Sequence, residues 1–167
     1  MSTGVTPGPD GAIRPPVLVP RQDAHDKIVI ALKNAGFGVV HQAVTRTVMI
    51  DGAAGRVADW LSDAMPRDWL VVTSKTAVRI LTEQHLLGDL QVKVAAVGKA
   101  TGRALREAGV NADLVPSRQS GAGLVEAWTA DGARVLLPVS GLAAPTVPDG
   151  LRARGCDVTR VDLYTTE

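Results

Sequence analysis

The sequence has few of the residues that mark several large classes of protein. It contains one cysteine, Cys156, so no disulfide can form within the chain, and a reducing, cytoplasmic setting is expected. Aromatic residues make up only 3% of the chain, which argues against a base-stacking surface for single-stranded nucleic acid. No apolar run reaches the roughly 18 residues that a membrane-spanning helix requires.

The charge is also nearly balanced, with 18 lysine and arginine residues against 17 aspartate and glutamate residues. A net charge of +1 argues against a broad nucleic-acid footprint. The three histidines are scattered without the spacing of metal ligands, so no metal is expected. We therefore expect neither nucleic acid nor a membrane as a partner.

The remaining composition is that of a globular chain with a short leader. The chain has 167 residues, of which 46% are hydrophobic, which suffices for one domain or two small ones. Residues 1–16, "MSTGVTPGPDGAIRPP", are rich in glycine and proline and lack the apolar core of a signal peptide. They are predicted to be a disordered leader.

One short pattern recurs three times, as "ALKNAG" at residues 31–36, "ALREAG" at 104–109 and "GLRARG" at 150–155. The final glycine of each is predicted to end a helix in the left-handed conformation. The stretches that follow, at 37–44, 110–116 and 156–164, fit short strands.

Continuous apolar runs predict further strands at residues 17–20, 69–73, 94–97 and 134–138. Runs without alternation are typical of parallel strands buried on both faces. Helices are predicted at residues 23–35, 74–84, 99–108, 120–130 and 145–154. Residues 45–60 indicate a linker or crossing strand, followed by a helix that starts near Asp51. The alternation predicts an α/β fold of three layers, with helices on both faces of a parallel sheet.

Small hydroxyl residues, glycines and a few basic residues follow these strands. In open α/β sheets, ligands bind at the carboxyl ends of the strands, where helix N-termini offer free N–H groups. Such an edge suits an anion with several carboxylates or phosphates. The candidate binding residues are Arg21, Thr73, Ser74, Gly98, Lys99, Thr101, Ser120 and Ser140.

Several of these candidates also have an ordinary structural explanation. Serine and threonine commonly cap helices, at about 1 kcal/mol each, which accounts equally well for Thr73 and Ser74. Lys99 fits a solvated surface charge, and Thr101 fits local hydrogen bonding to the backbone. On pattern alone, Tyr164, the only tyrosine, is either a packing residue at a strand end or a site residue.

The order of these segments resembles the uroporphyrinogen-III synthase family. The resemblance lies in "VLVPRQDA", "DWLVVTSKTAVRIL", "VAAVGKATGRALREAG" and "RVLLPVSG", and in "LRARGCDVTRVDLYTT" near the end of the sequence. It implies two α/β domains joined by a two-stranded ladder. Residues 17–44 are then the N-terminal part of domain 1, 45–163 are domain 2, and 164–167 start the return to domain 1. On this template the first domain is incomplete.

The same resemblance implies an enzyme that cyclises hydroxymethylbilane, a linear tetrapyrrole rich in carboxylates, to uroporphyrinogen III. The last pyrrole ring is inverted through a spiro intermediate, and water is lost. No cofactor is implied, and the protein is expected to be a monomer. Tyr164 matches a family tyrosine that helps the hydroxyl group leave or positions the last ring, and a phenol can donate a proton or a hydrogen bond at neutral pH. Thr73, Ser74 and Thr101 match positions of the substrate cleft, and Arg21 matches a frequent basic residue.

Two positions depart from the family pattern. The family often has an arginine after "LLP" and a second one a few residues later, where this sequence has Val139 and Ala144. A non-catalytic binding or regulatory module of the same family, an inactive fragment, and a generic anion-binding α/β domain are the alternatives.

Overall fold

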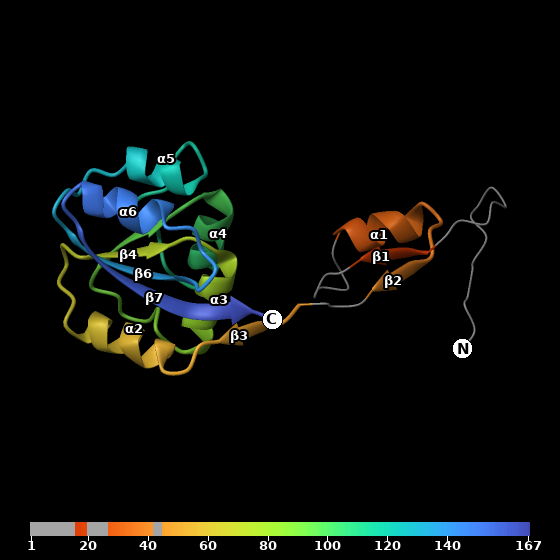
Figure 1. Ribbon diagram of the computed structural model, residues 1–167, viewed down its shortest axis with the longest axis horizontal. Coiled ribbons are helices and arrows are strands. Elements are labelled where there is room, and N and C mark those ends of the chain that lie inside the picture. Colours follow the sequence, from red (N-terminus) through yellow and green to blue (C-terminus); the bar gives the residue numbers. More distant parts are fainter. Residues whose placement is uncertain (1–15, 20–26, 42–44) are drawn as a thin grey trace. The chain divides into compact units, whose positions relative to one another are not determined.

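The computed structural model describes residues 16–19, 27–41 and 45–167 (Figure 1). The predicted leader lies outside these ranges except for Pro16, and so does Arg21. The described chain divides into two compact units. The smaller is Met1–Thr47 with Thr166–Glu167, and the larger is Val48–Thr165.

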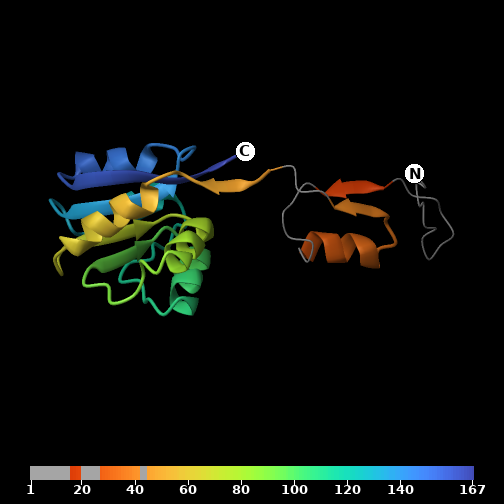
Figure 2. The same ribbon diagram turned by 90° about the horizontal axis from the view of Figure 1, so that it is seen from below.

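The smaller unit contains a strand, a helix and a second strand. These are β1 (Val17–Val19), α1 (Lys27–Asn34) and β2 (Val39–His41). The two strands pair in parallel, and α1 lies along one side of them (Figure 2). A parallel pair needs a crossover connection, which α1 supplies. The buried residues Val19 and Val29 form its small apolar centre.

The larger unit is built on a five-stranded sheet. Its strands, in spatial order, are β3 (Thr47–Met49), β7 (Asp157–Thr166), β6 (Arg134–Ser140), β4 (Trp69–Val72) and β5 (Lys93–Ala96). The last four are parallel. The segment of β3 runs against β7, because Arg46 exchanges both backbone hydrogen bonds with Glu167 while Ile50 donates to Leu163.

Helices cover both faces of this sheet, so the unit has the three layers that the sequence predicts (Figure 1). Successive residues of β4 point to opposite faces. Leu70 and Val72 pack in the apolar cluster under three helices: α2 (Ala53–Ser62), α3 (Lys75–Glu83) and α4 (Lys99–Glu107). Trp69 and Val71 pack in the cluster under α5 (Gly121–Glu126) and α6 (Thr146–Ala153). In the described chain, no helix is both long and apolar enough to cross a membrane.

The recurrent glycine stop is confirmed. Gly36, Gly109 and Gly155 have φ values of 78°, 85° and 77°. In each case the following residue donates its N–H five residues back, as in Val110 to Leu105, which satisfies a carbonyl at the end of the helix. The spacing of these glycines in the sequence therefore places three of the helix ends correctly.

Two predicted elements were wrong in extent. Residues 110–116 form no strand, and only a bridge between Leu114 and Ala95 remains. The reason is that the Asp113 side chain accepts the N–H of Val94 at 2.7 Å, which takes the donor that a further strand needs. The helix predicted at 120–130 ends at Glu126, because Trp128 leaves it to pack on Trp69 with ring centroids 4.8 Å apart.

Two glycine-to-alanine substitutions should have opposite effects on stability. At both Gly109 and Gly55, no atom lies within 4 Å of an added Cβ, so the backbone conformation alone decides. Gly109→Ala forces alanine into the left-handed region and should lower the free energy of unfolding by about 1 kcal/mol or more. Gly55→Ala, inside α2, should raise it by about 0.5–1 kcal/mol. Urea unfolding followed by circular dichroism measures both. Changes of the same sign would contradict the assignment of a helix stop at Gly109.

Candidate functional site

The carboxyl ends of β4, β5 and β6 meet at one edge of the larger unit and enclose a cavity of about 450 Å³. We call it the edge cavity. Its volume lies within the range of small-molecule sites, about 300–1,000 Å³. Residues from the strand ends and from the starts of α5 and α6 line it, among them Thr73, Val97, Ser120, Ala144, Thr146 and Arg160.

Three hydroxyl groups and the guanidinium of Arg160 stand in a wall of the edge cavity that is otherwise apolar. Thr73 follows β4, Ser120 precedes α5, and Thr146 begins α6. The Ser120 oxygen also caps α5, accepting the N–H of Gly123 at 3.0 Å. Hydroxyls can donate to an anion, and the apolar part of the wall can hold the body of a ligand. Of the predicted binding residues, Thr73 and Ser120 are thus brought together.

Ser74 lies apart from this cavity and contacts Tyr164 instead. Its Oγ is 3.0 Å from the phenol oxygen of Tyr164, which comes from β7 and is 8% exposed. The same Oγ accepts the N–H of Ala77 at 3.0 Å and so caps α3. Ser74 therefore caps α3 and contacts Tyr164 at the same time. The contact joins two residues that are 90 positions apart in the sequence.

The other predicted residues have separate surroundings. Gly98 is buried and precedes α4, whose first N–H, from Lys99, donates to Oε1 of Gln119 at 3.0 Å. The start of α4 is therefore already covered by a side chain of the protein. Thr101 is 5% exposed inside α4, and the Ser140 Oγ accepts the N–H of Leu142 at 3.2 Å. None of these side chains lines the edge cavity, and Arg21 lies outside the described residues.

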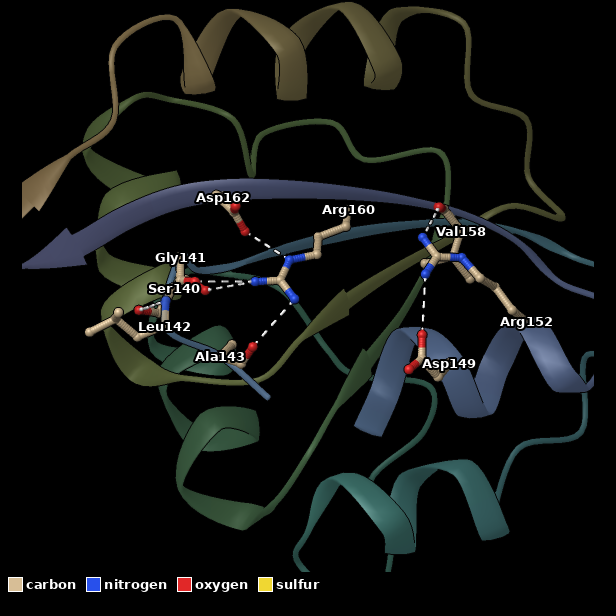
Figure 3. A network of polar contacts seen from close by, with 9 residues as sticks. All are labelled: Ser140, Gly141, Leu142, Ala143, Asp149, Arg152, Val158, Arg160 and Asp162. Carbon is tan, nitrogen blue, oxygen red and sulfur yellow. Dashed lines mark hydrogen bonds and ion pairs between the residues drawn. The ribbon is translucent and has the colours of Figure 1, made fainter. Parts of the chain in front are cut away.

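Arg160 is a residue of this edge that the sequence reasoning missed. From β7 its guanidinium donates to Asp162 at 2.8 Å and to the carbonyl of Ala143 at 3.3 Å (Figure 3). Further contacts of 3.5 and 3.4 Å reach the carbonyls of Ser140 and Gly141. One arginine thus holds the whole turn after β6.

This arginine stands against the segment where the family resemblance predicts arginines. Val139 and Ala144 occupy the two expected positions, and both line the edge cavity together with Arg160. A guanidinium is therefore present, but it comes from the neighbouring strand. The available signal was the pair Arg160 and Asp162, two opposite charges that alternate with the apolar residues Val161 and Leu163 and so share one face of the strand.

Neither a metal site nor an exposed thiol is found in the described part of the chain. No group of three or more histidine, cysteine, aspartate or glutamate side chains there could hold a metal ion. Cys156 is buried, with its sulfur 3.6 Å from the carbonyl oxygen of Ala130. It belongs to the apolar cluster under α5 and α6.

Comparison with known proteins points to one family. A family model described as Uroporphyrinogen-III synthase HemD matches residues 26–167. The chloroplastic uroporphyrinogen-III synthase of Oryza sativa subsp. japonica is 31% identical over 109 residues, which are 59% of this chain and 36% of the relative. A putative uroporphyrinogen-III synthase of Methanothermobacter thermautotrophicus is 31% identical over 104 residues, or 58% of this chain and 41% of the relative.

Solved structures show the same fold. A mutant uroporphyrinogen III synthase from Thermus thermophilus superposes with a TM-score of 0.66 at 21% identity, covering 90% of this chain and 62% of that one. The wild-type protein gives 0.63 at 22% identity, with coverages of 90% and 61%. The chain thus spans about two fifths of the length of the curated relatives and about three fifths of the solved chains.

Removing the guanidinium of Arg160 should loosen the turn after β6. In Arg160→Met, the carbonyls of Ser140, Gly141 and Ala143 lose a shared donor. We expect the amide of Ala143, which donates to Ser140, to exchange with solvent about tenfold faster, a loss of about 1.4 kcal/mol in local stability. Hydrogen exchange measured by NMR tests this.

Arg152→Met is the matched control. Like Arg160, Arg152 pairs with an aspartate, Asp149. It donates to one carbonyl, that of Val158, and does not contact the turn after β6 (Figure 3). Its removal should leave the exchange of Ala143 unchanged. Equal acceleration in both variants would mean that Arg160 has no specific hold on the turn.

Proposed function

The chain belongs to the uroporphyrinogen-III synthase family, and we propose that it cyclises hydroxymethylbilane to uroporphyrinogen III, with inversion of the last pyrrole ring and loss of water. The observation that carries the proposal for this chain is the 3.0 Å contact between Ser74 and Tyr164. It sets the hydroxyl of the only tyrosine beside a helix start at the carboxyl edge of the sheet.

The first chemical step needs a proton donor. The terminal C–O bond of the substrate breaks, its electrons stay on the oxygen, and that oxygen must take up a proton to leave as water. We assign this donation to Tyr164, because a phenol carries its proton at neutral pH and can donate it to a developing hydroxide.

Ser74 is the positioning residue in this proposal. Its Oγ already accepts the N–H of Ala77, and its own hydrogen can point to the Tyr164 oxygen. The Tyr164 hydrogen is then free to point outward to the leaving group. Donation in series, from Ala77 to Ser74 to Tyr164 to the substrate, strengthens each hydrogen bond in the chain. The positive end of the α3 dipole acts in the same direction.

The surroundings of the edge favour a ligand rich in carboxylates. Acidic residues are usually favoured in the first turn of a helix, yet α3, α4 and α5 have none there, whereas α6 carries Asp149. α3 begins with Lys75 instead. We propose that the hydroxyls of Thr73, Ser120 and Thr146 bind a carboxylate side chain of the substrate within the edge cavity.

The remaining predicted contacts take supporting roles in this proposal. Ser140 holds the turn after β6, Gly98 allows Gln119 to approach within 3.1 Å of where a Cβ would stand, and Thr101 packs inside α4. The basic contact at Arg21 stays a prediction. We further propose a cytoplasmic monomer, in line with a single cysteine, Cys156, which is buried.

Removing the phenol hydroxyl should reduce catalysis strongly. With enzymatically generated hydroxymethylbilane, Tyr164→Phe should form the type III isomer about 100-fold more slowly, because the general acid is lost. Ser74→Ala should cost about tenfold, because the phenol loses its orientation and α3 its cap. Thr159→Ala, which removes an exposed hydroxyl on the same strand, should retain full activity.

A double variant separates positioning from simple damage. If Ser74 acts through Tyr164, then adding Ser74→Ala to Tyr164→Phe should cost nothing further. A further tenfold loss would show that Ser74 acts independently. Formation of only the spontaneous type I isomer by the unmodified chain, together with retained binding of uroporphyrin, would replace the proposal with that of a binding module.

A further inference from the structure

A second hollow, separate from the edge cavity, lies between α4 and the segment that follows it. Its volume is about 490 Å³. One wall is the face of α4 with Lys99, Gly102, Arg103 and Arg106, and the other is residues 111–117 with Asn111 and Ser117. We call it the α4 hollow. It shares no lining residue with the edge cavity.

The basic side chains of the α4 hollow have no acidic partners in the described structure. Several arginines elsewhere are paired, as Arg79 is with Glu83 and Arg118 with Glu126. For Lys99, Arg103 and Arg106, which are exposed, no side-chain hydrogen bond or ion pair is found among the described residues. No carboxylate of the described chain lines the hollow.

The two acidic residues nearest in the sequence, Glu107 and Asp113, lie outside the α4 hollow. Glu107 lines a different hollow, shared with Lys75, Arg79 and Glu83. The Asp113 carboxylate accepts the N–H of Val94. Neither carboxylate forms an ion pair with Lys99, Arg103 or Arg106 among the described residues.

This arrangement disfavours the helix that bears it. Lys99, Arg103 and Arg106 are spaced four and three residues apart, so they repel one another along one face of α4. Lys99 also stands at the helix start, where the dipole already places positive charge. A bound anion would relieve both effects.

We propose that the α4 hollow binds a small molecule with several closely spaced phosphate groups. The three cations extend over about 10 Å of helix, at a rise of 1.5 Å per residue. Guanidinium groups match phosphate oxygens in pairs, and Asn111 and Ser117 add neutral hydrogen-bonding groups on the opposite wall. A tetrapyrrole, whether linear or closed, spreads its carboxylates over four rings, whereas an oligophosphate concentrates its charge over the length of this wall.

Titration calorimetry with phosphate, pyrophosphate and tripolyphosphate tests the proposal. Affinity should rise at each step of the series, because the longer anions reach more of the three cations. The double variant Arg103→Gln/Arg106→Gln should weaken tripolyphosphate binding at least about tenfold. Since both side chains are exposed, the fold should be retained, which circular dichroism verifies.

Arg56→Gln/Arg67→Gln is the matched control. Both arginines are exposed and outside the α4 hollow, and their replacement removes the same charge. Tripolyphosphate affinity should change less than about twofold in this variant. Equal weakening in the two double variants, or no binding by the unmodified chain, would overturn the proposal.

Binding of uroporphyrin to the same variants is the second measurement of this experiment. Its binding should be unaffected by Arg103→Gln/Arg106→Gln if the hollow is independent of the edge cavity. If that variant weakens uroporphyrin as much as tripolyphosphate, the hollow belongs to the tetrapyrrole site and the proposal of an oligophosphate site is refuted. Because this measurement does not depend on ring closure, the outcome is distinct from failure of the proposed catalysis.

Discussion

Parallel pairing of β4, β5, β6 and β7 is the constraint on which the functional edge depends. Parallel strands bring all their carboxyl ends to one side, so every loop that leaves them opens there. The helices that follow then begin at the same edge with their unpaired N–H groups. Hydroxyls at Thr73, Ser120 and Thr146 reach one cavity for this reason, although they are widely separated in sequence.

The same strand geometry also divides the edge in two. Along β4, odd-numbered residues point toward α5 and α6, and even-numbered residues point toward α3. This alternation continues past the strand, so Thr73 lines the edge cavity while Ser74 meets Tyr164. Two adjacent hydroxyls therefore serve different surroundings, one facing a cavity and the other a buried tyrosine. A ligand that used both would have to lie across the end of the strand.

Sequence reasoning located the elements well because their signals are local. Apolar runs marked β4 and β6, and glycines marked three helix ends, as the positive φ of Gly109 illustrates. It failed where the contact depends on a side chain that is far away in the sequence. The position of Arg160 beside the turn after β6 follows from the pairing of β6 with β7, and nothing in the sequence near Ser140 reveals that pairing. The cover that Gln119 places over the start of α4 is equally non-local.

The basic groups near this edge differ in whether an acidic residue pairs with them. Arg160 is neutralised by Asp162, and a half-exposed pair of this kind contributes less than about 1 kcal/mol. Arg160 contributes mainly by fixing the shape of the turn after β6, because its guanidinium donates to three carbonyls of that turn. Attraction for an anion must therefore come from backbone N–H groups, hydroxyls and unpaired cations. Of these, hydroxyls line the edge cavity, whereas unpaired cations line the α4 hollow. Hydroxyls and amides select an anion by the direction of its acceptor oxygens, whereas exposed cations select it by the density of its negative charge. The two sites should consequently differ in salt sensitivity, with the α4 hollow losing affinity far more steeply as ionic strength rises.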